Sequence, residues 1–133
     1  MDDSVKAVME DCTRASDEER MSFPEVVGRM MAASVESYHT DMLRAERTFY
    51  MPDGESYVVP THRAAATPAR DFVPAGVEAA IRATQSGRIG YRDFCEDILR
   101  AGCVGYIVSF PGRRAVYFGR TGDFHVEHFP PAP

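Results

Sequence analysis

Apolar residues along the chain recur at two different spacings, one typical of helices and one typical of strands. Between Val5 and Ala15, apolar side chains fall three and four positions apart, which places Val5, Val8, Met9 and Cys12 on one face of a helix. The same spacing predicts three further helices, which begin near Ser22, Pro74 and Tyr91. Each helix would therefore present an apolar stripe to a core.

Three short runs rich in β-branched and aromatic residues follow the second helix, and three more follow the fourth. The predicted strands are Glu36–Met42, Glu46–Met51, Ser56–Pro60, Val104–Phe110, Arg114–Gly119 and Phe124–Phe129. Asp53-Gly54 predicts a tight hairpin turn in the first half, and Thr121-Gly122 takes the same place in the second. Each half therefore reads helix–helix–strand–strand–strand.

Two local signals mark the ends of the predicted helices. Ser22 is followed three residues later by Glu25, which is the capping-box pattern of a helix start. Gly102 follows the last predicted helix at the C′ position, where a left-handed backbone favours glycine. Ser34 occupies the equivalent position in the first half.

The second half of the chain repeats the first without a gap, at an offset of about 68 residues. Identical residues in the two copies include the pairs Glu10/Glu78, Arg14/Arg82, Tyr38/Tyr106 and Gly54/Gly122. We therefore predict a single α+β domain over residues 1–133, built by tandem duplication, with repeats at about 5–60 and 73–128 and a linker at 61–72. A pseudo-twofold axis would relate the repeats, and the helices would cover one face of a joint antiparallel sheet.

Composition and charge exclude several classes of protein. A formal net charge of −5 argues against a nucleic-acid partner, because phosphate contacts require a basic surface. Three cysteines without CxxC spacing favour a reducing cytoplasm over a disulfide framework. The acidic start of the chain lacks the features of a signal peptide, and no apolar run is long enough to predict a membrane span. The sequence therefore predicts a cytoplasmic protein without a membrane partner.

Aromatic and glycine positions in three stretches carry a family resemblance. These stretches are Ser22-Phe23 through Tyr38, Thr48-Phe49-Tyr50 with Asp53-Gly54, and Gly90-Tyr91 through Tyr106 to Gly122. At these positions the chain resembles a bacterial family known as domain of unknown function 1398, some members of which carry the label "phage envelope protein". The resemblance covers about Val5 to Pro130 and implies neither a known activity nor catalytic residues.

The densest polar cluster lies in the last predicted strand. Strand alternation places Asp123, His125 and Glu127 on one face and His128 on the other. A carboxylate and an imidazole two residues apart can share a proton or a metal ion, and the alternative is a solvated strand end. His39 would be a third group if the joined sheet brings it near His125. No cofactor motif and no metal-ligand spacing accompany these residues, so the sequence predicts neither a cofactor nor a metal.

Tyrosines form a second candidate site. Tyr38 and Tyr106 are the clearest polar-tipped aromatic residues shared by the two copies. Together with Tyr57 they are the predicted ligand-binding residues, because tyrosine offers both contact area and a hydroxyl group. The alternative is that they anchor the helices on the sheet.

Arginines near two matching turns form a third candidate site. Arg113 and Arg114 lie at the first turn between strands of the second half, and Arg44 and Arg47 lie near the matching turn of the first half. The two pairs could form related basic sites that hold an anion, and the alternative is a solvated hairpin tip.

The cysteines, by contrast, fit core positions. Cys12, Cys95 and Cys103 align with Ala80, Val27 and Val35 of the other copy. They are therefore predicted to be small core residues, not nucleophiles.

Three functions agree with these observations. The favoured one is a non-enzymatic module that binds a small ligand or a protein, and free sheet edges leave a homodimer open. An alternative is a small metal-dependent or acid–base enzyme that uses His125 and Glu127. The third is a phage-derived accessory or structural protein, which depends on the family label alone.

Overall fold

A computed structural model describes residues 1–130, so the last three residues of the predicted domain 1–133 lie outside the described residues. The elements are, in chain order, α1 (Asp3–Asp17), α2 (Phe23–Ala32), β1 (Ser37–Asp41), β2 (Glu46–Tyr50), β3 (Ser56–Pro60), α3 (Pro74–Gln85), α4 (Tyr91–Arg100), β4 (Cys103–Ser109), β5 (Arg114–Gly119) and β6 (Phe124–His128). Within residues 1–130, no helix has the length and apolar content needed to cross a membrane.

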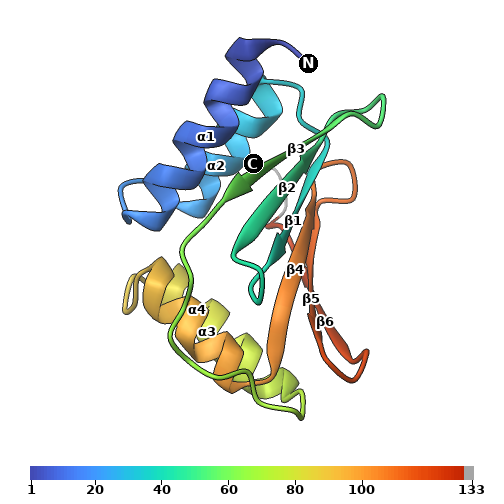
Figure 1. The fold of residues 1–133 in the computed structure, drawn as a ribbon. Coiled ribbons are helices and arrows are strands. Elements are labelled where there is room, and N and C mark those ends of the chain that lie inside the picture. Colours follow the sequence, from blue (N-terminus) through green and yellow to red (C-terminus); the bar gives the residue numbers. More distant parts are fainter. Residues whose placement is uncertain (131–133) are drawn as a thin grey trace.

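The strands form one six-stranded sheet in the order β3-β2-β1-β4-β5-β6, and every neighbouring pair is antiparallel. The two predicted three-stranded meanders join through β1 and β4 at the centre, which leaves β3 and β6 as the edges. All four helices lie on one side of this sheet (Figure 1). The predicted α+β class and the antiparallel sheet are confirmed.

Strand alternation divides the sheet into a buried face and an open face. Tyr38, Phe49 and Val108 point toward the helices and are almost fully buried. They join helix residues such as Met30 and Ile98 in one hydrophobic cluster. Burial of this apolar face against the helices is what holds the two layers together.

Local signals predicted the element boundaries to within one or two residues. The capping box is confirmed, because Ser22 accepts the N–H of Glu25 and the Glu25 carboxylate accepts the N–H of Ser22. Gly102 and Ser34 adopt the predicted left-handed backbone, with φ of 88° and 62°. Helix α1 begins two residues before the predicted start because the Asp2 carboxylate caps its first turn.

Helix α4 receives its cap from the other half of the chain. Its N-cap residue, Gly90, has no side chain that could accept a hydrogen bond from the first turn. Instead, a carboxylate oxygen of Glu19 in the α1–α2 turn accepts the N–H of Arg92 at 3.0 Å. A Cβ atom at Gly90 would lie 2.5 Å from that carboxylate, so a larger residue there would have to displace the Glu19 side chain from its capping position.

Candidate functional site

A buried arginine lies at the centre of the helix-facing side of the sheet. Arg47 is the second residue of β2, and its cross-strand partners are Thr40 on β1 and Val59 on β3. Only 2% of its surface is exposed. Arginine side chains are almost never fully buried unless they are paired with an opposite charge.

Hydroxyl groups and aromatic rings surround the guanidinium. Arg47 Nε donates to Thr40 Oγ1 at 3.0 Å, and Nη2 donates to the hydroxyls of Tyr91 at 2.7 Å and Tyr106 at 3.1 Å. The guanidinium carbon lies 5.2 Å from the ring centroid of Tyr38 and 5.7 Å from that of Tyr91, which are cation–π distances. We call these five residues the arginine cluster.

No carboxylate within residues 1–130 forms a salt bridge with Arg47. Burial raises the pKa of Tyr91 well above its ordinary value although the charge of Arg47 lowers it, so Tyr91 stays a neutral phenol. Taking a charge out of water costs several kcal/mol, and the hydroxyls and ring faces offset only part of that cost. The arginine cluster therefore holds a positive charge that no described residue neutralises at short range.

An open cleft of about 560 Å³ lies between the C-terminal half of α1, the end of β3 with the first linker residues, and α4. Its lining includes three carboxylates and three basic side chains: Glu10, Asp17, Glu18, Arg14, His62 and Arg92. Asp17 joins the walls, because its carboxylate accepts the Thr61 hydroxyl at 2.8 Å and the His62 N–H at 3.0 Å, while Arg92 Nε donates to its carbonyl at 2.8 Å. We call this the Asp17 cleft.

The Asp17 cleft adjoins the arginine cluster. Val59 lines the cleft and is the cross-strand partner of Arg47, and Arg92 directly follows Tyr91 on α4. The charge of Asp17 acts on Arg47 at longer range.

One nitrogen of the Arg47 guanidinium, Nη1, makes no hydrogen bond within residues 1–130. Within residues 1–130, His125 Nε2 is the only fully buried side-chain nitrogen or oxygen without a hydrogen-bond partner. Arg47 Nη1 also donates to none of these residues, whereas the N–H groups of Nε and Nη2 are taken by Thr40, Tyr91 and Tyr106. The two N–H groups of Nη1 are therefore the donors that Arg47 has left for an anion.

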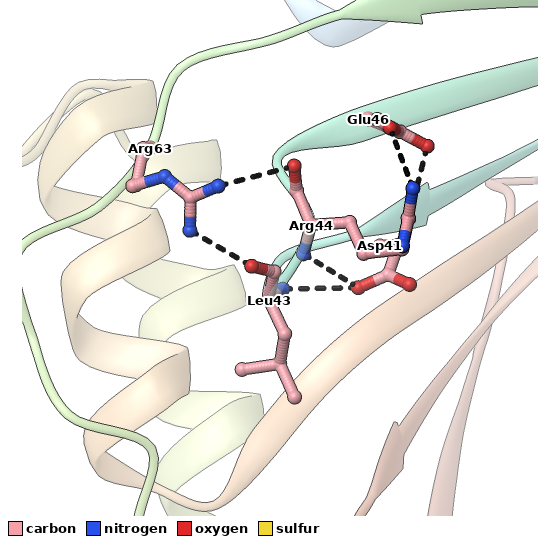
Figure 2. A network of polar contacts seen from close by, with 5 residues as sticks. All are labelled: Asp41, Leu43, Arg44, Glu46 and Arg63. Atoms are coloured by element: carbon pink, nitrogen blue, oxygen red, sulfur yellow. Dashed lines mark hydrogen bonds and ion pairs between the residues drawn. The ribbon is translucent and has the colours of Figure 1, made fainter.

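The linker beside the cleft is fastened to the β1–β2 turn. The Arg63 guanidinium donates to the carbonyls of Leu43 at 2.8 Å and Arg44 at 3.3 Å (Figure 2). The turn itself is closed by the Asp41 carboxylate, which accepts the N–H groups of Leu43 and Arg44, both at 3.0 Å. Arg44 also pairs with Glu46 at 3.2 Å. These contacts hold the linker in place as one wall of the Asp17 cleft.

The sequence interpretation was wrong about Arg47. It grouped Arg47 with Arg44 near a turn, as part of a basic spot or a solvated tip. Arg44 does lie exposed at the turn, but Arg47 points into the core. A signal was present in the strand pattern, because Arg47 and Phe49 share one face of β2 and Phe49 is a clear core residue.

The predicted ligand-binding tyrosines all lie around this site. Tyr38 and Tyr106 belong to the arginine cluster and are only 2% and 4% exposed. Tyr57 is half-buried and donates its hydroxyl hydrogen bond to Glu10, a residue of the Asp17 cleft. Contact of these tyrosines with a ligand stays a prediction.

The structure does not bring the predicted histidines together. His125 and Glu127 lie on the helix-facing side of β6, with His125 Nε2 3.6 Å from Glu127 Oε2, and Arg82 of α3 holds Glu127 at 2.6 Å. His39 lies on the opposite face of β1, with its ring 4.8 Å from that of Tyr50. The expected approach of His39 to His125 is therefore wrong. No group of three His, Cys, Asp or Glu side chains among residues 1–130 is arranged to hold a metal ion.

The three cysteines are buried core residues, as predicted. Burial raises the pKa of the Cys95 and Cys103 thiols to about 11, so both stay protonated at neutral pH.

We expect the three thiols of the folded protein to react only slowly with Ellman's reagent. The denatured protein should react fully and release three equivalents of coloured thiolate from the reagent. A thiol that reacts within seconds in the folded protein would contradict this assignment.

A family model described as "Protein of unknown function (DUF1398)" matches residues 10–127, which confirms the resemblance noted in the sequence. Relatives in curated collections include uncharacterized protein Rv2012 of Mycobacterium tuberculosis (strain ATCC 25618 / H37Rv) and uncharacterized protein Mb2035 of Mycobacterium bovis. Each is 36% identical to the chain over 50 residues, which cover 38% of this chain. The match spans 30% of the length of each relative.

Proposed function

This chain belongs to the DUF1398 family, and we propose that it is a non-enzymatic binding module whose Asp17 cleft takes a small ligand that bears a carboxylate group. The observation that carries this proposal is the buried positive charge of Arg47, which lacks a short-range counter-ion within residues 1–130 and lies next to Val59 of the cleft wall, with Nη1 donating to none of these residues. A ligand carboxylate would supply the missing negative charge.

Charge and geometry support a small carboxylate over other anions. The N–H groups of Nη1 can donate to a carboxylate oxygen, and charge-assisted hydrogen bonds of this kind are the strong ones. The cleft lining balances Glu10, Asp17 and Glu18 against Arg14 and Arg92, so it offers no excess positive charge to a multiply charged anion such as a polyphosphate. The same carboxylates favour an amine elsewhere on the ligand, so an amino acid is the best match to the cleft.

The first test is a thermal-shift titration of the folded protein. The probes are acetate, propionate and the common amino acids, each compared with sodium chloride at equal ionic strength. A probe at about 100 times its Kd should add about 2.7 kcal/mol to the free energy of unfolding. We expect this stabilisation from at least one amino acid and its loss in Arg47→Met, which replaces the aliphatic stem but removes the guanidinium and its charge.

A charge-matched variant controls for unspecific effects. Arg88→Met removes an exposed arginine whose side chain donates only to Ser86 among the described residues, so it should keep the full ligand response. The proposal fails if no probe stabilises the wild type beyond the salt control. It fails equally if Arg47→Met responds as the wild type does. A shift with divalent metals that disappears in His125→Ala would instead support the enzyme alternative.

We also propose the tandem duplication and its pseudo-twofold axis. The strand registers support them, because His39 pairs with Ile107 across the central strands, and these residues are equivalent in the two sequence repeats. The axis would pass between them. Equivalent pairs recur at the outer strands, where Thr48 faces Val58 and Val116 faces Val126.

One domain over residues 1–133 is part of the same proposal, with repeats at about 5–60 and 73–128 and the linker at 61–72. A single hydrophobic cluster with residues from both halves supports it. The free, buried cysteines support a reducing cytoplasm as the compartment.

A further inference from the structure

The sheet face opposite the helices carries no covering layer within residues 1–130 (Figure 1). The strand registers arrange its side chains in three rows that cross all six strands. The central row consists of Val58, Thr48, His39, Ile107, Val116 and Val126. Four of these six residues are aliphatic, so an apolar row runs through the middle of a face exposed on one side.

Two outer rows flank the central row. One of them is mostly polar, and the other mixes polar and apolar residues. One outer row consists of Ser56, Tyr50, Ser37, Ser109, Arg114 and His128. The other consists of Pro60, Glu46, Asp41, Gly105, Phe118 and Phe124. Val58 at one edge strand and Phe124 at the other are 49% and 62% exposed. Sheets with one solvated face normally place polar residues there, whereas an apolar centre with a polar rim is typical of a protein interface.

We propose that this open face is the interface between two copies of the chain. Each copy would place its apolar row against that of the other, in the face-to-face packing of two sheets about 10 Å apart. In a twofold-symmetric dimer, both copies use the same surface at the interface. The apolar row of one copy would therefore be covered by a row of equal length from the other copy.

Charge supports a second copy as the occupant. The chain carries a net charge of −5, which would make two copies repel each other if the charge lay at the contact. The open face holds only Asp41, Glu46 and Arg114 as formally charged residues, and Glu46 is already paired with Arg44. The contact itself is therefore nearly neutral.

The size of the face is also sufficient. Six strands about 4.8 Å apart and about 17 Å long give roughly 500 Å² of flat surface per copy, before side-chain relief is added. Two copies would therefore bury about 1,000 Å² or more, which reaches the lower bound for a specific interface.

Sedimentation velocity over a range of protein concentrations tests this proposal. We expect the mass of the wild type to approach twice the 14.8 kDa of one chain as the concentration rises. Val116→Lys places a charge in the apolar row between Ile107 and Val126 and should leave the protein at the mass of one chain. Val58→Lys, at a well exposed end of the row, gives a second variant with little risk to folding.

Met31→Lys is the matched control. Met31 lies on α2 and is 52% exposed, close to the exposure of Val58, so this variant should dimerise as the wild type does. Circular dichroism establishes that each variant is folded. A wild type that keeps the mass of one chain at all concentrations overturns the proposal. Folded Val116→Lys and Val58→Lys proteins that still dimerise also overturn it and point to pairing through the edge strands β3 and β6.

Discussion

Arg47→Ala is expected to lower the free energy of unfolding by about 3 kcal/mol. The substitution removes the buried aliphatic stem and leaves a cavity in the core beside Val59. It also takes the donor away from the Thr40 hydroxyl and from the two tyrosine hydroxyls. Tyr91 and Tyr106 keep the 2.7 Å hydrogen bond between them, which limits the loss.

Arg47→Met separates the loss of volume from the loss of charge. Methionine fills most of the space of the arginine stem and avoids the cost of burying a charge, so its stability should stay within about 1 kcal/mol of the wild type. Urea denaturation of both variants measures the difference. Equal and large losses in Arg47→Ala and Arg47→Met would show that the charge itself stabilises the fold, which would contradict our account of an unneutralised cation.

Gly102→Ala is expected to destabilise the protein by about 3 kcal/mol or more. Gly102 has a φ of 88°, where an alanine costs about 1 kcal/mol in backbone conformation alone. A Cβ atom there would also lie 2.1 Å from the Asp71 carbonyl oxygen and 2.8 Å from Phe72 Cα. Since both are backbone atoms, the overlap can be relieved only by moving the linker away from the end of α4.

Gly122→Ala provides the comparison for this effect. Gly122 has a similar φ of 83°, but no atom lies within 4 Å of the position of its Cβ. Its alanine variant should lose only the conformational part, about 1 kcal/mol. Chemical denaturation of the two variants under the same conditions measures the steric part as the difference. Equal losses would show that the contact with Asp71 does not limit this position.

These two glycines illustrate how far sequence reasoning could reach. Both were predicted in turn or capping positions, because a left-handed backbone after a helix or within a hairpin is a local requirement. The contact of Gly102 with Asp71 joins residues on either side of α3 and α4, and no local pattern reveals it. Backbone conformation could therefore be predicted here, and the energetic cost of changing it could not.

The candidate site shows the same limit more strongly. The tyrosines at 38 and 106 were identified because both repeats carry them, yet nothing in the sequence brought Arg47 between them. That contact requires β1 and β4 to pair at the centre of the sheet and α4 to carry Tyr91 onto the same face. His39 failed as a partner of His125 for a related reason, since the joint sheet places the two side chains on opposite faces.

The sequence by itself determined the helices, the strands, their caps and turns and the α+β class, because apolar periodicity and backbone preferences act over a few neighbouring residues. Only the tertiary structure decided which strands meet at the centre, that Arg47 is buried without a short-range counter-ion within residues 1–130, and that a cleft opens beside it. These features depend on contacts between residues more than 40 positions apart, such as Arg47 with Tyr91 and Asp17 with Thr61. Such contacts form only when whole layers pack, so no local pattern in the chain encodes them.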